Sequence, residues 1–272
     1  PDHCALGRAC GTVAGGCDLS CFDEGWKRVE RECAGPDPPG AVIVEPIQGR
    51  AGVIVPPIEF LPRLCARARA LGLVVIYDEI MTGAGRTGPF WAWERSGPEA
   101  EPDLLAAGKG LGGGVAIAAL LGKPALMEVW AKHAPPSGEA PYASTYYAHP
   151  LACAGALAAI EALTRPAEGG SDIPPRADLA GDLRAALDSA DGSLLVRGAG
   201  RMAALEWRTR DAARGADPAR MEAALRALLE AGVLAIPGGR EGNVLSILPA
   251  RSLTEGQWSH AVRTLALAAA AP

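Results

Sequence analysis

Apolar and polar positions alternate in blocks after residue 40, and these blocks predict alternating strands and helices. Residues 41–45 and 73–77 are short, nearly continuous apolar runs, which are typical of strands buried on both faces. Between them, residues 58–71 repeat apolar positions at three- and four-residue steps, which predicts a helix ending before Gly72. Further strands are predicted at 103–107 and 115–121, with helices at 124–133 and 151–163. This order indicates an α/β fold with a mostly parallel sheet.

A segment rich in proline, glycine and polar residues, 164–175, predicts a boundary between two lobes. We therefore expect a large domain at 1–165 and a small C-terminal α+β domain at 166–272. The elements predicted in the second domain are helices near 176–190, 218–232 and 254–270, and strands near 194–198, 201–207, 233–237 and 243–248.

Composition narrows the class of protein. A net charge of −5 offers no basic face for nucleic acid. No apolar run reaches the ~18 residues of a membrane span. These features are typical of a cytoplasmic globular protein.

One lysine stands out chemically. The chain has four lysines, and Lys109 lies alone in the glycine-rich string Ala-Ala-Gly-Lys-Gly-Leu-Gly-Gly-Gly. The apolar run 73–77, earlier in the chain, ends in Asp78 and Glu79. Taken singly, such a lysine is an ordinary loop residue and such an acid a helix cap. Together they are what a pyridoxal phosphate enzyme needs: an amine for the Schiff base and a carboxylate for the pyridine nitrogen. A nucleotide phosphate loop is excluded, because Gly110 follows the lysine where serine or threonine is required.

Asp78 and Lys109 belong to two of four motifs that follow one another along the chain. They are Glu45-Pro-Ile-Gln48-Gly49, Asp78-Glu-Ile-Met-Thr-Gly-Ala-Gly-Arg-Thr-Gly88, Pro102-Asp-Leu-Leu-Ala-Ala-Gly-Lys109-Gly-Leu-Gly-Gly and Thr145-Tyr-Tyr-Ala-His-Pro150. The chain resembles the class III aminotransferases, a branch of the fold-type I pyridoxal phosphate enzymes. The resemblance covers nearly the whole chain, including 196–202 and 242–249 in the small domain.

The resemblance implies roles for particular residues. Lys109 would carry pyridoxal 5′-phosphate and later move the substrate proton, and Asp78 would pair with the pyridine nitrogen. Gln48 and Met81 would line the ring. Thr145 would reach the cofactor phosphate across a homodimer interface, although without the resemblance we would interpret it as a helix cap before Pro150. Another reaction of the same cofactor, such as decarboxylation, a mutase reaction or racemisation, is an alternative to transamination.

The family usually places a long segment ahead of the point where this sequence begins. That segment carries the phosphate-binding loop and the aromatic residue that stacks on the ring. Residues 11–16 do not replace it, because they lack a preceding strand and a following helix. We therefore expect an incomplete large domain that exposes apolar surface or a sheet edge, which dimerisation would cover. A degenerate, non-catalytic module of the same fold is the second hypothesis.

The seven cysteines raise a separate question. Five lie in the first 33 positions, and the intervals between them do not fit paired Cys-x-x-Cys zinc ligands. Because the family carries a similar cysteine-bearing loop, the resemblance implies a reduced structural loop. An irregular metal site stays open as the alternative.

The substrate is indicated by Glu45, a substrate-binding candidate. In many family members the glutamate at this position pairs with an arginine of the C-terminal domain that otherwise binds a substrate carboxylate. Here Ser246 stands at the expected place, and Arg251 lies five residues on. We therefore expect Glu45 to lack its usual partner and to meet a cationic donor, such as an amine, an amino sugar or an ω-amino acid.

Overall fold

The computed structural model describes residues 17–132, 145–164, 178–187, 192–211 and 215–270. The chain divides into two compact units. The first comprises Pro1–Pro46, Pro56–Gly85 and Pro89–Thr164, and the second comprises Ile47–Val55, Arg86–Gly88 and Arg165–Pro272. The second unit therefore includes two short segments that come from the middle of the first in sequence.

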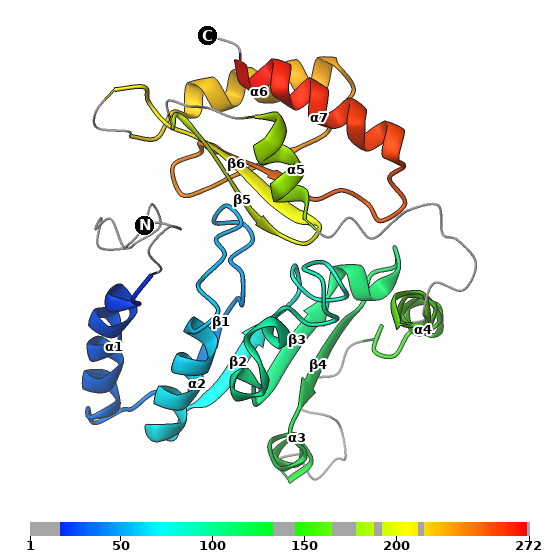
Figure 1. Ribbon diagram of the computed structural model, residues 1–272. Coiled ribbons are helices and arrows are strands. Elements are labelled where there is room, and N and C mark those ends of the chain that lie inside the picture. The colour runs from blue at the N-terminus through cyan, green and yellow to red at the C-terminus, as the bar shows by residue number, and fades with distance from the viewer. Residues whose placement is uncertain (1–16, 133–144, 165–177, 188–191, 212–214, 271–272) are drawn as a thin grey trace. The chain divides into compact units, whose positions relative to one another are not determined.

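The first unit is built on a four-stranded sheet of order β1-β2-β3-β4 (Figure 1). Its strands are β1 (Ala41–Val44), β2 (Val74–Asp78), β3 (Leu104–Gly108) and β4 (Ala118–Gly122). The first three strands are parallel and β4 is antiparallel to β3. The predicted mostly parallel sheet is confirmed. The antiparallel strand follows β3 directly because a turn around Lys109 reverses the chain.

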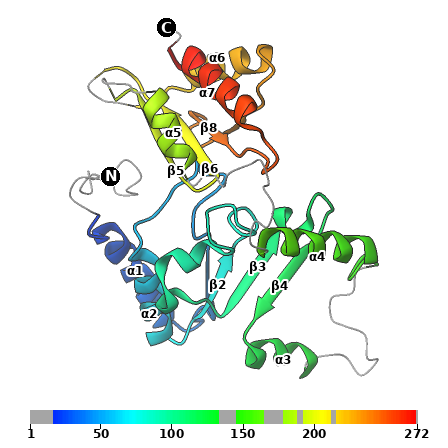
Figure 2. The same cartoon turned by 45° about the vertical axis from the view of Figure 1, so that its right-hand side comes forward.

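Helices α1 (Ser20–Cys33) and α2 (Phe60–Ala70) pack against one face of this sheet. The core between them is formed by Trp26, Leu61, Leu64, Cys65, Ala68, Leu73, Val75, Tyr77 and Ala100. The other elements of the unit are α3 (Pro124–Lys132), α4 (Pro150–Thr164) and three short 3-10 helices, η1 (Ala92–Ser96), η2 (Pro98–Ala100) and η3 (Lys109–Gly112). Figure 2 shows α3 following the end of β4, with α4 beside the upper part of β3 and β4.

The expectation of a cysteine-rich loop before residue 33 is wrong for its second half. Cys21 and Cys33 lie on α1, whose residues Phe22, Trp26 and Val29 pack into the core at helical spacing. Cys17, Cys21, Cys33, Cys65 and Cys153 are all reduced. Cys4 and Cys10 lie outside the described residues. Within the described ranges no three His, Cys, Asp or Glu side chains gather as metal ligands.

The opposite face of the sheet is poorly covered. Ile43 on β1 is 65% exposed and Leu120 on β4 is 48% exposed. Directly paired strand residues point to the same side, and the register pairs Ile43 with Ile76, Asp78 with Ala106, and Ala106 with Leu120. Asp78 therefore shares its face with exposed apolar side chains. This agrees with the expectation of exposed apolar surface on the sheet.

The second unit is a four-stranded antiparallel sheet of order β5-β6-β8-β7 with helices packed on it (Figure 1). Its elements are α5 (Leu179–Ala186), β5 (Leu194–Ala199), β6 (Met202–Trp207), α6 (Pro218–Glu230), β7 (Ile236–Gly238), β8 (Val244–Ile247) and α7 (Glu255–Ala270). All six residues of β6 are buried, because β6 is a central strand beneath the helices. The predicted α+β packing is confirmed.

The segment Ile47–Val55 joins the second unit as a tight loop. Gln48 and Ile54 exchange two backbone hydrogen bonds, of 3.1 and 3.0 Å. Arg197 on β5 donates from Nε to the carbonyl oxygen of Gly52 at 2.7 Å. Within the ranges described above, no helix is both long and apolar enough to cross a bilayer.

Candidate active site

Lys109 lies in a sharp turn at the carboxyl end of β3. It has φ 44°, a left-handed backbone conformation that residues with a side chain rarely adopt. The turn continues through η3 to Gly113, which has φ 60°. The Lys109 side chain is exposed and donates no hydrogen bond to any residue that the structure describes. The turn therefore presents an unpaired amine at the end of a strand.

Asp78 ends β2, the strand that runs parallel to β3. The register places Asp78 opposite Ala106, three residues before Lys109. Carboxyl ends of adjacent parallel strands meet at one edge of the sheet, where ligand sites of α/β folds lie. Oδ1 of Asp78 accepts the N–H of Ile80 at 3.0 Å, and Oδ2 accepts no hydrogen bond from the described part of the chain. One carboxylate oxygen is thus available to a ligand.

Glu79 is only 1% exposed. Its Oε2 accepts the hydroxyl of Thr82 at 2.6 Å and the N–H of Ala92 at 3.0 Å, and its Oε1 accepts the N–H of Trp93 at 3.0 Å. Burial raises the pKa of this carboxyl, while the three donors act in the opposite direction. Glu79 therefore ties the segment after Asp78 back onto the strand. The sequence analysis predicted no role of its own for Glu79. The alternation of Val75, Tyr77 and Glu79 was the signal that its side chain belongs to the buried face.

The Lys109 turn is supported from two directions. A methyl group on Gly110 would lie 3.3 Å from Cβ of Ala84, in the turn after β2. On the other side α4 packs against η3, where a methyl group on Gly155 would lie only 2.9 Å from the carbonyl oxygen of Gly112. Only a residue without a side chain fits this approach. These contacts fix the position of the strained lysine.

The remaining predicted cofactor-binding residues are less constrained. Met81 is half-buried in the turn that follows Asp78. Thr145 is exposed and lies five residues before the start of α4, so it does not cap that helix. Gln48 is exposed in the second unit. The cofactor contacts of these three residues stay predictions.

Two findings bear on the substrate-binding candidate. Glu45 is half-buried and has an interaction partner within the protein. That it lacks the family's usual arginine and meets a cationic donor stays a prediction. Ser246 lies buried on β8, paired with Ala204 and Ile236. The strand therefore presents a small hydroxyl and no guanidinium at this position.

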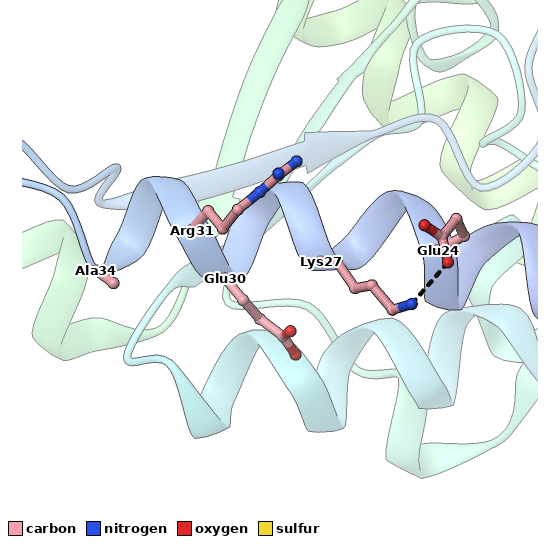
Figure 3. Close-up of a pocket in the computed structure, with 5 residues that line it drawn as sticks. All are labelled: Glu24, Lys27, Glu30, Arg31 and Ala34. Carbon is pink, nitrogen blue, oxygen red and sulfur yellow. Dashed lines mark hydrogen bonds and ion pairs between the residues drawn. The ribbon is translucent and has the colours of Figure 1, made fainter.

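A surface hollow lies elsewhere, along the exposed side of α1 (Figure 3). It is lined by Glu24, Lys27, Glu30, Arg31 and Ala34, and Lys27 donates to Glu24 at 2.7 Å. All five residues are exposed; four belong to α1 and Ala34 directly follows its end. The hollow is an ordinary solvated helix surface and takes no part in the arrangement of Asp78 and Lys109.

Comparison with known proteins decides the family. The family model described as aminotransferase class-III matches residues 21–268. The chain belongs to the class III aminotransferases. This family uses pyridoxal phosphate, and the described residues fit it: an amine without a protein partner, and a carboxylate with one open oxygen on the adjacent strand end.

Individual relatives agree with this assignment. The chain is 37% identical over 172 residues to the acetylornithine aminotransferase of Methanopyrus kandleri, covering 62% of this chain and 41% of that protein. It is 34% identical over 212 residues to the 4-aminobutyrate aminotransferase of Mycobacterium bovis, covering 77% and 45%. Among solved structures, an amine transaminase from an uncultivated Pseudomonas species in a PLP-bound form is 30% identical, with a TM-score of 0.76, covering 91% of this chain and 55% of that one.

The chain covers only part of each relative. The 272-residue chain spans about half the length of the relatives it matches. The match supports the expectation that the sequence corresponds to part of the family fold.

Proposed function

We propose that this chain supplies the lysine- and aspartate-bearing part of a transaminase that moves an amino group from an amino donor to an oxo acid or aldehyde. One observation carries the proposal: Lys109 and Asp78 lie at the carboxyl ends of two adjacent parallel strands, each with an unpaired polar atom. When bound, pyridoxal phosphate would supply an electron sink for negative charge at the substrate carbon.

The residues of the chain would hold the cofactor and move the substrate proton. The amine of Lys109 would hold the cofactor covalently until an amino donor displaces it, and would then move a proton at the substrate carbon. Oδ2 of Asp78 would accept a hydrogen bond from the protonated ring nitrogen of the cofactor. Because Glu79 and the contacts at Gly110 and Gly155 hold both turns, these two groups would be positioned before any ligand arrives.

The other assignments belong to the same proposal. Gln48 and Met81 would flank the ring, and Thr145 would contact the phosphate within a homodimer. A donor with a terminal amine is supported by the names of relatives, which include a 4-aminobutyrate aminotransferase and an amine transaminase. Ser246 is consistent with such a donor, because serine at this position offers no charge to a substrate carboxylate.

The decisive experiment is reductive trapping. The chain is incubated with pyridoxal phosphate, reduced with borohydride and digested, and the labelled peptide is identified by mass. Because the chain has four lysines, Lys27, Lys109, Lys123 and Lys132, the labelled site can be resolved. We expect label on Lys109 and its loss in Lys109→Ala. A chain that binds no pyridoxal phosphate at any concentration, or labels its four lysines equally, contradicts the proposal.

A further inference from the structure

Arg86 lies in the second unit, and its guanidinium is fixed by backbone carbonyls. Nη1 of Arg86 donates to the carbonyl oxygen of Pro249 at 2.8 Å and to that of Arg201 at 3.4 Å. The N–H of Arg201 donates in turn to the carbonyl oxygen of Arg86 at 2.9 Å. These bonds hold the side chain in place through one of its three nitrogens.

The other two nitrogens of Arg86 are available. Nε and Nη2 donate to no residue within the described ranges, and neither is fully enclosed. These nitrogens form the planar edge of a guanidinium that binds an oxyanion through two parallel hydrogen bonds. The position of this edge is set by the protein before a ligand arrives.

Two further arginines, Arg201 and Arg251, lie close enough to act on Arg86 electrostatically. Burial, together with the charges of Arg201 and Arg251, lowers the pKa of Arg86. Arg201 is 7% exposed and donates from Nη2 to the carbonyl oxygen of Ala250 at 2.7 Å, beside the exposed Arg251. Arg86 and Arg251 carry like charges, and holding them near one another beside a partly buried guanidinium costs free energy, which a bound anion would offset.

Thr87 adds a second observation. It is 3% exposed, and its hydroxyl has no hydrogen-bond partner among the described residues. The backbone of Thr87 packs tightly on Gly200. A methyl group added to Gly200 would lie 2.5 Å from the carbonyl carbon of Thr87. The segment is thus held firmly, with an unsatisfied hydroxyl next in sequence to the guanidinium. Buried polar groups without partners are uncommon and indicate a missing ligand or water.

We propose that Arg86 and Arg251 form an oxyanion site for a phosphate group, as inorganic phosphate or as a small phosphoester. A dianion matches the gathered positive charge better than a single carboxylate does. This site is independent of the transaminase proposal, because its residues are separate from Asp78 and Lys109 in sequence and belong to the second unit.

Calorimetric titration of the 272-residue chain with inorganic phosphate, without pyridoxal phosphate and at fixed ionic strength, tests the site. Arg251→Gln is the test variant, because this side chain is exposed and makes no hydrogen bond that the fold needs. Arg240→Gln, which removes another exposed arginine of the same unit, is the matched control. We expect Arg251→Gln to weaken phosphate binding about tenfold or more, and the control less than about twofold.

Two further arms complete the test. Lys109→Ala must bind phosphate as the wild-type chain does, which separates this site from cofactor binding. Glycerol phosphate is titrated as a second probe. Comparing its dissociation constant with that of inorganic phosphate shows whether the site prefers a phosphoester or free phosphate. Equal affinity of wild type and Arg251→Gln overturns the proposal, as does phosphate binding no tighter than chloride.

Discussion

Gly155 of α4 lies so close to Gly112 that one added methyl group would stand 2.9 Å from the Gly112 carbonyl oxygen. This contact joins the helix to the turn that carries Lys109. Gly155→Ala should therefore displace the turn and destabilise the chain by about 1–3 kcal/mol, the usual cost of overpacking. Denaturant unfolding measures the loss.

A matched control exists for this substitution. Gly25 is also a helical glycine of the first unit, and nothing lies within 4 Å of an added methyl group there. Gly25→Ala should stabilise the chain by about 0.5–1 kcal/mol, because alanine loses less conformational entropy in a helix. If both variants shift stability in the same direction, the close approach at Gly155 has no energetic effect.

Lys109→Ala and Asp78→Asn should separate two roles. Lys109→Ala removes both the covalent anchor and the proton carrier, so turnover should fall on the order of 10⁴-fold or more. Asp78→Asn should keep reducible cofactor on Lys109 but lose turnover, because an amide does not stabilise a protonated ring nitrogen. The comparison is made in a form of the protein that shows measurable transaminase turnover. Equal turnover in Lys109→Ala and the parent would refute the lysine assignment.

Glu79→Gln should be costly although it conserves shape. The buried carboxylate accepts three donors, from Thr82, Ala92 and Trp93. In glutamine an NH2 group replaces one of the two carboxylate oxygens, and this NH2 group would face an N–H or hydroxyl donor. A buried donor is then left without an acceptor, at a cost of about 1–3 kcal/mol. Near-ultraviolet circular dichroism should also change, because the disturbed segment contains Trp91 and Trp93. Exposed Glu99→Gln should change neither measurement.

Asp103 should contribute stability that depends on pH. It accepts the N–H of Val75 at 2.8 Å and the ammonium of Lys123 at 2.6 Å, joining β2 to the end of β4. Burial alone would raise the pKa of this carboxyl, but the bonds from Lys123 and Val75 outweigh burial and hold it below its ordinary value. A lowered folded-state pKa means that stability is fully present above the unfolded pKa of about 3.9 and is lost as pH falls below it.

The measurement is the difference in unfolding free energy between wild type and Asp103→Asn. It should be about 1–3 kcal/mol at pH 7 and should shrink below about pH 4. Asp37→Asn, at an exposed position, should show no difference at either pH. A difference for Asp103→Asn that does not vary with pH would contradict a role for its charge.

The sequence predicted the strands and the pair of chemical groups because both depend on local patterns. The runs at 41–45 and 73–77 became β1 and β2, and Asp78 and Lys109 lie at the strand ends where the pattern placed them. Helix α1 was not predicted, because its cysteines were interpreted as part of a loop, although Phe22, Trp26 and Val29 recur at helical spacing.

The sequence did not predict contacts between positions that lie far apart in the chain. Nothing local indicates that residues 47–55 and 86–88 pack into the second unit, since these contacts join positions far apart in sequence. The burial of Ser246 depends on tertiary packing in the same way. The fixed guanidinium of Arg86 depends on carbonyls more than a hundred residues away, which no motif reveals.

Replacing Lys109 by glycine should stabilise the fold. The left-handed conformation at φ 44° costs a residue with a side chain about 1–2 kcal/mol, and glycine adopts it without that cost. Lys109→Gly should therefore unfold at higher denaturant concentration than wild type, after allowance for the extra entropy of glycine in the unfolded chain. A less stable variant would show that the lysine side chain itself supports the turn.

The backbone at Lys109 sets stability and reactivity against each other. A lysine in this conformation is a poor choice for stability, and glycine or asparagine would relieve the strain. The chain therefore gives up folding free energy at the position where it presents an amine at the end of β3, so that a better-folded turn and a reactive turn are alternatives here.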